Sequence, residues 1–340
     1  MELHNYSSPH LSPQGGVTVM MSRVLIALLP GIACAVWVFG WGILVNCLLA
    51  SLAAIAAEAG MLALRQRPVV ATLYDGSALV TGVLLALALP PLSPWWIPVI
   101  GSLFAIVVAK QLYGGLGYNP FNPAMAGYVV LLISFPLELG RWSPPFEPQG
   151  LLDTLTLVFT GALPAGATLD GLTMATPLDA VKTQLGLNVT LSELAGHGLF
   201  GHFGSRGWEW INLGYLIGGL WLLRVKVIQW QIPVATLAGL SSMALVFYAV
   251  NPDTSTSPAF QLFSGAAMLG AFFIATDPVS ACTTPRGRLI YGAGIGMLTY
   301  LIRTWGGYPD GMAFAVLLMN MAAPTLDHYT QPRVFGQPGG

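Results

Sequence analysis

Ten runs of mainly apolar residues follow one another along the chain, five on each side of a long polar segment. A helix needs about 20 apolar residues to cross a bilayer, so each run predicts a membrane span, the fifth and tenth being short ones. The runs are 23–40, 42–64, 72–89, 95–113, 123–135, 208–227, 232–250, 259–276, 289–304 and 311–323. The pattern predicts an all-α polytopic membrane protein with about ten transmembrane helices and one large loop.

Composition agrees with this prediction. Of 340 residues, 55% are hydrophobic and 8% are charged, and the mean hydropathy is +0.69. Soluble domains carry roughly 25% charged residues, so this chain could not cover its surface with enough charge to dissolve. The formal net charge is −1 and the basic residues form no cluster, which gives no indication of nucleic acid binding. The first 22 residues are typical of a polar leader and not of a cleavable signal peptide.

The distribution of basic residues predicts the orientation. With a cytoplasmic N-terminus, nine Lys and Arg residues fall on the inner side and four on the outer side. This excess predicts that both termini are cytoplasmic and that the loop is periplasmic, in a bacterial inner membrane. The expected organisation is a leader (1–22), a first five-helix repeat (23–136), the loop (137–207), a second five-helix repeat (208–325) and a tail (326–340).

The two halves resemble each other in sequence. TGVLLALALPP at 81–91 aligns with LGAFFIATDPV at 269–279, with a glycine and a proline in register. KQLYGGLGYNPFNPAMAGY at 110–128 matches RTWGGYPDGMAFA at 303–315, since each has a basic residue, an aromatic residue, Gly-Gly and a break containing proline. Five spans in each half would invert the second copy, as in transporter-like folds.

The paired breaks are candidate binding sites, because backbone groups freed at membrane depth must line a cavity or bind a ligand. In the first half the break contains Asn119 and Asn122. A helix beginning near Asn122 would direct its amides at an anionic or carbonyl-bearing ligand, such as the edge of a flavin ring. Helix capping by Asn and Pro is the alternative.

Few acids lie near the apolar runs, and ionisable groups there are costly and usually functional. Asp75 and Asp277, ahead of Glu58, are the candidates for an ion pathway. Capping of the segments that follow them is the alternative. The three cysteines are scattered, and the two loop histidines have a spacing that suits no helical metal pair, so no metal site is predicted.

Within the loop, DGLTMATP resembles the D-x-x-[ST]-G-A-[ST] signal that a flavin transferase recognises. That enzyme esterifies the phosphate of FMN onto the last hydroxyl, which is Thr176 here; Asp170, Thr173 and Ala175 match the other positions. Met174 stands where the signal usually has glycine. A phosphoester on threonine tethers a cofactor without making the residue a catalytic group, so no catalytic residue is predicted. An ordinary polar turn is the alternative.

The flavinylation-type sequence, the ten-run layout, NPFNPA at 119–124 and ATDPVSA at 275–281 together resemble one family. It comprises the D subunit of the Rnf, or Rsx, ion-translocating oxidoreductase and the B subunit of the Na+-pumping NADH:quinone reductase. The resemblance covers nearly the whole chain. It implies two inverted five-helix repeats, covalent FMN on Thr176 and a second, noncovalent flavin, riboflavin, near the cytoplasmic side.

The resemblance also implies a function and partners. The chain would carry electrons in a complex that moves them between ferredoxin and NAD+ while it drives Na+ or H+ across the membrane. The implied partners are the other Rnf subunits, including the periplasmic flavoprotein subunit and the small membrane subunits, with a flavin transferase for maturation and membrane lipid around the spans. A secondary transporter of a small solute with the same repeat is the alternative, and a scaffold without a cofactor is a third.

Overall fold

The structure is a computed structural model that describes residues 16–164, 166, 168–194, 196, 198–308 and 310–331. Within these residues it is helical, with two isolated β-bridges and no strand. The helices before the loop are α1 (Val17–Phe39), α2 (Gly42–Leu64), α3 (Val69–Leu73), α4 (Ser77–Ala86), α5 (Trp96–Leu103), the π-helix η1 (Phe104–Gln111) and α6 (Pro123–Ser134). The loop contains α7 (Pro136–Gly140), α8 (Leu151–Thr160), α9 (Leu169–Leu172), α10 (Pro177–Gly186) and α11 (Leu191–Leu194). After it come α12 (Trp208–Arg224), α13 (Gln231–Val250), α14 (Pro258–Leu262), α15 (Ala267–Leu269), the π-helix η2 (Gly270–Ile274), α16 (Pro285–Trp305) and α17 (Met312–Tyr329).

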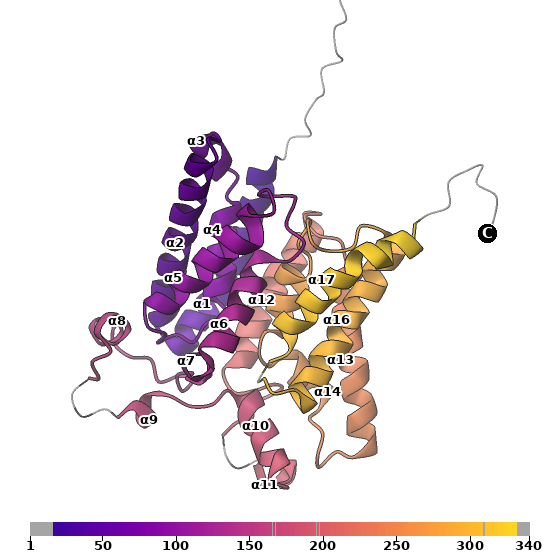
Figure 1. Cartoon of the computed structure of the whole chain (residues 1–340). Coiled ribbons are helices and arrows are strands. Elements are labelled where there is room, and N and C mark those ends of the chain that lie inside the picture. Colours follow the sequence, from indigo (N-terminus) through magenta and orange to yellow (C-terminus); the bar gives the residue numbers. More distant parts are fainter. Residues whose placement is uncertain are drawn as a thin grey trace, which may run out of the picture.

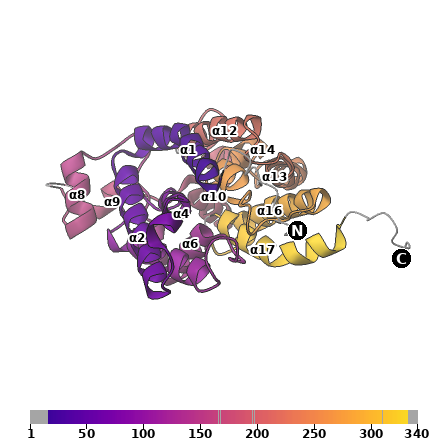
Figure 2. The ribbon, with the colours of Figure 1, turned by 90° about the horizontal axis from the view of Figure 1, so that it is seen from above.

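The helices before the loop and the helices after it form two adjacent bundles (Figure 2). α1 and α12 pack against each other where the bundles meet. α1 begins and α17 ends at one end of the molecule, while the loop helices α8 to α11 gather at the opposite end (Figure 1). We refer to these as the termini end and the loop end.

Each predicted apolar run coincides with helix, although the boundaries differ in places. α1 begins at Val17, inside the predicted leader, and α17 continues to Tyr329, inside the predicted tail. The run at 259–276 is broken at Gly265, whose φ of +56° separates α14 from α15. In the described part of the chain, α1, α2 and α13 are long and apolar enough to cross a membrane. With the shorter apolar helices around them, they make the chain a multi-pass membrane protein.

Four helices begin with the same local signal. A Ser, Thr or Asn side chain accepts a hydrogen bond from the backbone N–H three residues later, and a proline occupies the first turn. These starts are Asn122–Pro123 for α6, Thr176–Pro177 for α10, Ser257–Pro258 for α14 and Thr284–Pro285 for α16. The side chain satisfies one free N–H of the first turn, and proline has no N–H to satisfy there. The local sequence therefore sets the start of the helix that follows Thr176.

The contact between α1 and α12 depends on glycine. A Cβ atom added to Gly214 would lie 2.8 Å from the Cα atom of Gly31 and 2.8 Å from the carbonyl oxygen of Pro30. Real Cβ atoms do not approach backbone this closely, so the two helices touch through their main chains. The position of one bundle against the other is therefore sensitive to the side chain at residue 214.

We expect Gly214→Val to lower the apparent Tm of the protein in detergent, because two backbones would have to separate. Overpacking of this kind costs about 1–3 kcal/mol. Gly60→Val is the matched control, since a Cβ atom at Gly60 of α2 would meet nothing within 4 Å. Equal Tm values for the two variants would contradict the proposed backbone contact.

Candidate functional site

A cavity of about 60 Å³ lies at the loop end, where the two bundles and the loop meet. We call it the loop-end cavity. Its wall includes Leu87 and Met125 of the first bundle, Thr176 of the loop, and Trp208 and Met312 of the second bundle. The predicted acceptor Thr176 therefore lies at the junction of the two halves of the chain.

Thr176 is the N-cap of α10. Its Oγ1 accepts a hydrogen bond from the backbone N–H of Asp179 at 3.2 Å, and its side chain is partly exposed. Ala175 is exposed, and the backbone of Thr173 is extended, with φ −133° and ψ 144°. Asp170 belongs to the short helix α9, and its side chain lies outside the described residues. The predicted signal thus runs from a helical turn through an extended segment to a helix N-terminus.

Met174, the departure from the usual signal, is held to Trp142 by an isolated antiparallel β-bridge. The N–H of Trp142 donates to the carbonyl of Met174 at 3.1 Å, and the N–H of Met174 donates to the carbonyl of Trp142 at 2.6 Å. The φ angle of Met174 is not in the positive range that favours glycine. The backbone at this position therefore does not need glycine, and a methionine fits it without strain.

Polar groups are few in the loop-end cavity. Ser205 is fully buried, lines the cavity, and its Oγ has no hydrogen-bond partner. Asp310 also lines it, and its carboxylate accepts from the N–H of Ala266 at 2.8 Å and from the guanidinium of Arg303 at 3.0 Å. A buried unpartnered hydroxyl is costly, so the site favours a polar ligand atom near Ser205.

This donor set fits a flavin phosphoester on Thr176. Thr176 lies at the N-terminus of α10, and a helix N-terminus favours negative charge. Asp179 in the same turn opposes this effect. The mainly apolar walls suit one edge of a flavin ring system, although the volume of about 60 Å³ holds only part of it.

α10 is fastened to the second bundle by Lys182. Its ammonium donates to the carbonyls of Gly306 and Tyr308, the latter at 3.0 Å, just beyond the C-terminal end of α16. A cation is favourable beside the exposed carbonyls of a helix C-terminus. Partial burial lowers the pKa of Lys182, and the nearby Asp179 acts in the opposite direction.

A second cavity, of about 90 Å³, lies towards the termini end and brings together several predicted residues. Asn119, Asn122 and Asp277 line it, together with Ser77 and Lys110. We call it the termini-end cavity. Residues of two separate predictions, the asparagines of the flavin site and Asp277 of the ion pathway, therefore line one cavity.

The two asparagines of the first break differ in whether their side-chain oxygen has a hydrogen-bond partner. The Asn122 side chain caps α6 by accepting from Met125 N–H at 3.1 Å, and it donates to the carbonyl of Ile274 at 3.3 Å. Asn119 donates to the carbonyl of Phe121 at 2.9 Å, while its buried Oδ1 has no partner. Asn119 is thus the residue of this pair with an acceptor left for a ligand.

The two predicted ion-pathway acids both bind local groups. Asp75 accepts from the N–H of Ser77 at 2.7 Å and from its hydroxyl at 2.5 Å. Asp277 accepts from the hydroxyl of Ser280 at 2.7 Å. Both therefore organise the turns that follow them, and Asp277 alone of the two lines the termini-end cavity.

A buried ion pair next to this cavity was not predicted from the sequence. Lys110 Nζ lies 2.6 Å from Glu58 Oε1, and both side chains are 1% exposed. Lys110 also donates to Ser77 Oγ at 2.6 Å, and Gln111 donates to Glu58 Oε1 at 2.7 Å. Glu58 Oε2 has no partner. The acid and the base lie in different helices with no fixed spacing in the sequence, so only the fold reveals that they pair.

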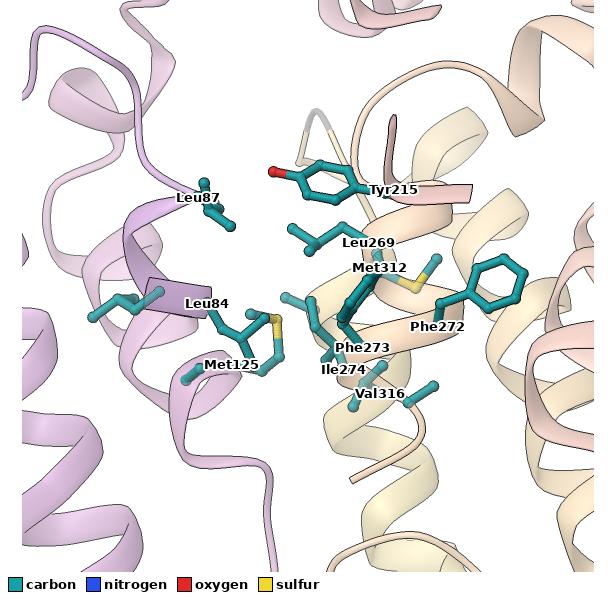
Figure 3. Packing of buried hydrophobic residues seen from close by; sticks show 14 of the residues in the cluster. Leu84, Leu87, Met125, Tyr215, Leu269, Phe272, Phe273, Ile274, Met312 and Val316 are labelled. Carbon is teal, nitrogen blue, oxygen red and sulfur yellow. The ribbon is translucent and has the colours of Figure 1, made fainter. Parts of the chain in front are cut away.

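Residues of one packed apolar cluster line both cavities, and Figure 3 shows part of this cluster. Leu84 and Phe273 line the termini-end cavity, whereas Leu87, Met125 and Ile274 line the loop-end cavity. The members labelled in Figure 3 lie in or directly after α4 and in α6 of the first bundle, and in α12, α15, η2 and α17 of the second. The junction of the bundles is therefore closed in the middle and hollow at each end.

Metal ligands do not gather in the part of the chain that the structure describes: no three His, Cys, Asp or Glu residues come together there. Of the two loop histidines, His197 lies outside the described residues, and His202 is exposed.

We expect Lys182→Ala to loosen α10, because the carbonyls beyond α16 would lose their cationic donor. Allowing for the partial exposure of Lys182, the loss is about 1 kcal/mol. Hydrogen exchange of the α10 amides should become faster while exchange in α13 stays unchanged. Thr183→Ala is the control, since Thr183 is exposed on the same helix. Unchanged exchange in Lys182→Ala would contradict the fastening.

We expect Lys110→Met to destabilise the protein strongly, because Glu58 would be left as an uncompensated buried charge. Breaking a buried pair from one side costs about 3–5 kcal/mol. The double variant Glu58→Gln with Lys110→Met removes both charges and should recover most of that loss. Thermal unfolding in detergent measures the stability of the natural chain, of Lys110→Met and of the double variant. A double variant no more stable than Lys110→Met would show that the two residues do not act as a pair.

Comparison with known proteins places the chain in a family. A family model described as the NQR2, RnfD, RnfE family matches residues 4–336. The chain is 54% identical over 341 residues to the D subunit of the ion-translocating oxidoreductase complex of Vibrio cholerae, a match that covers 97% of this chain and 98% of that protein. Proteins of the same name from Aliivibrio salmonicida and Escherichia fergusonii are 53% and 51% identical over 345 and 346 residues, with 98% of each chain covered. The chain therefore belongs to the NQR2, RnfD, RnfE family.

Proposed function

We propose that this chain is an electron-carrying membrane subunit of an ion-translocating oxidoreductase complex, with FMN joined to Thr176 by a phosphoester. One observation carries the proposal. The last hydroxyl of a sequence that resembles the flavinylation signal caps a helix and lines a cavity with an unpartnered buried hydroxyl, that of Ser205. The names of the relatives support the role in such a complex.

The two bundles are proposed to be inverted repeats of five spans each. Two patterns of packing support this. α1 ends where α12 begins, and the two helices are in contact. α2 packs on α4 and α5 in the first bundle, as α13 packs on α14 and α16 in the second. In addition, α6 and α17 each begin after a break with an Asn or Asp side chain accepting from the first turn.

We propose an orientation in the bacterial inner membrane with cytoplasmic termini and a periplasmic loop. The excess of basic residues on one side supports it. The separation of the termini end from the loop end agrees with it (Figure 1).

When bound, FMN would supply reversible electron transfer, and the chain would supply tethering, orientation and exclusion of water. Thr176 would hold the phosphate at the N-terminus of α10, and the loop-end cavity would receive part of the ring system. A second flavin, riboflavin, is proposed for the termini-end cavity, where Asn119 offers its free Oδ1. Asp277 and Asp75 remain the proposed residues of a pathway for Na+ or H+.

The proposed partners are the other subunits of the complex, including a periplasmic flavoprotein subunit and the small membrane subunits. The names of the relatives, each one part of a complex, support partners of this kind. A flavin transferase would attach the FMN, and lipid would surround the spans.

We expect intact-mass and peptide mass spectrometry to find a gain of FMN minus water on Thr176 when the chain is co-expressed with a flavin transferase. Thr176→Ser should keep this gain, because it keeps the hydroxyl. Thr176→Ala should lose it completely. Thr176→Asn should also lose it, although asparagine retains the cap of α10, which is worth about 0.5–2 kcal/mol.

The asparagine variant separates attachment of the flavin from stability of the helix. No mass gain on the natural chain, with the transferase active on a control substrate, would overturn the proposal. It would leave the secondary transporter as the better account of the fold. A gain retained in Thr176→Asn would mean that another residue is the acceptor.

A further inference from the structure

The loop-end cavity has an aromatic wall formed by two indoles, which are in mutual contact with a third ring behind them. The Trp142 and Trp208 rings have centroids 4.7 Å apart at 57°, and Phe39 lies 5.7 Å from Trp142 and 5.4 Å from Trp208. Both indoles line the cavity together with Thr176. The rings come from the end of α1, from the loop before α8 and from the first residue of α12, so three separate parts of the chain meet here.

Trp142 is coupled to the predicted attachment sequence by its main chain. The two hydrogen bonds between Trp142 and Met174 place this indole beside a residue only two positions before Thr176. A group attached to Thr176 therefore starts next to Trp142. The backbone is extended at Thr176, where α10 begins.

Packing around the indoles is incomplete. A smaller cavity of about 20 Å³ lies against the same residues, with Phe39, Trp142, Trp208 and Tyr215 in its wall. Empty space beside large side chains forfeits dispersion contacts. The aromatic wall can therefore gain contacts from a flat partner, and the unpartnered Ser205 hydroxyl offers a polar contact at its edge.

We infer that Trp142 and Trp208 form the surface on which the ring system of the flavin on Thr176 rests, with Ser205 at its polar edge. This inference depends on the proposed attachment of FMN to Thr176. Offset or tilted contact between aromatic rings contributes about 0.5–1.5 kcal/mol beyond the area buried. The two indoles would order the ring system at the junction of the bundles and limit its contact with water.

A second aromatic group at the loop end provides the control. Trp37 contacts Phe146 at 5.1 Å and Trp210 at 6.3 Å between ring centroids. Trp37 and Trp210 do not line the loop-end cavity. Variants of these residues remove an indole from the same end of the protein without touching the proposed resting surface.

The test uses the full chain co-expressed with a flavin transferase and purified in detergent. An indole in contact with an isoalloxazine quenches its fluorescence by excited-state electron transfer, whereas phenylalanine does not. We expect a short flavin fluorescence lifetime in the folded protein and a longer one after denaturation. Trp142→Phe and Trp208→Phe should each lengthen the folded-state lifetime to an extent limited by the remaining indole, and the double variant should lengthen it several-fold, with some quenching left from Tyr128, which also lines the cavity. Trp37→Phe and Trp210→Phe should leave it unchanged.

Intact mass measured on the same samples separates the two levels of the proposal. Full attachment with the lifetime of the natural chain in the single variants and in the double variant would overturn the resting surface and leave the attachment standing. Absence of the FMN mass gain in the natural chain would overturn both. Should the double variant fail to fold, the single variants still decide, because each removes one quenching indole from the cavity wall.

Discussion

A helix that breaks inside an apolar bundle must have its freed backbone groups satisfied by other parts of the protein, because lipid offers them no partner. Single polar side chains do this at the junction of the two bundles. Asp310 accepts from the N–H groups of Ala266 and Met312, and Asn212 accepts from Met268 N–H while it donates to the carbonyl of Gly265. These contacts determine where the broken helices stop. They leave space at the ends of the junction, where short helices replace continuous ones.

The two cavities follow from this arrangement. Each is lined by residues of both bundles, and a packed apolar cluster lies between them. The termini-end cavity adjoins the buried pair of Lys110 and Glu58, whereas the loop-end cavity adjoins the pair of Arg303 and Asp310. In the described part of the chain, Lys110 and Arg303 thus lie buried in the last turns of η1 and α16, the helices that precede α6 and α17. Charge is available beside each cavity without lying free in the apolar middle.

The sequence predicted the helices well and the contacts between distant residues poorly. Apolar runs located the helices because a helix that crosses a bilayer must be apolar over about 20 residues. Cap and proline pairs such as Asn122–Pro123 are local, so they could be read directly. Glycine within an apolar run indicates a kink or a close helix contact, so Gly265 could be noticed from the sequence, but not that the helix ends there. The Glu58–Lys110 pair and the Trp142–Met174 bridge join residues far apart in the sequence, which periodicity cannot relate. The roles of Asp75, Asp277 and Asn119 in ion or flavin binding stay predictions.

A cofactor tethered to a loop has a defined position only if the loop is held on both sides of the attachment point. Thr176 meets this condition. Before it, Met174 is held to Trp142 by two backbone hydrogen bonds; after it, Lys182 fastens α10 to the carbonyls beyond α16. The first contact places Thr176 beside the aromatic wall, and the second places α10 against the second bundle. Trp142 also packs on Phe39 of α1. The loop is therefore held by contacts with both halves of the chain. A covalent link at this residue would therefore give high effective concentration at one particular place and not merely retention at the membrane surface.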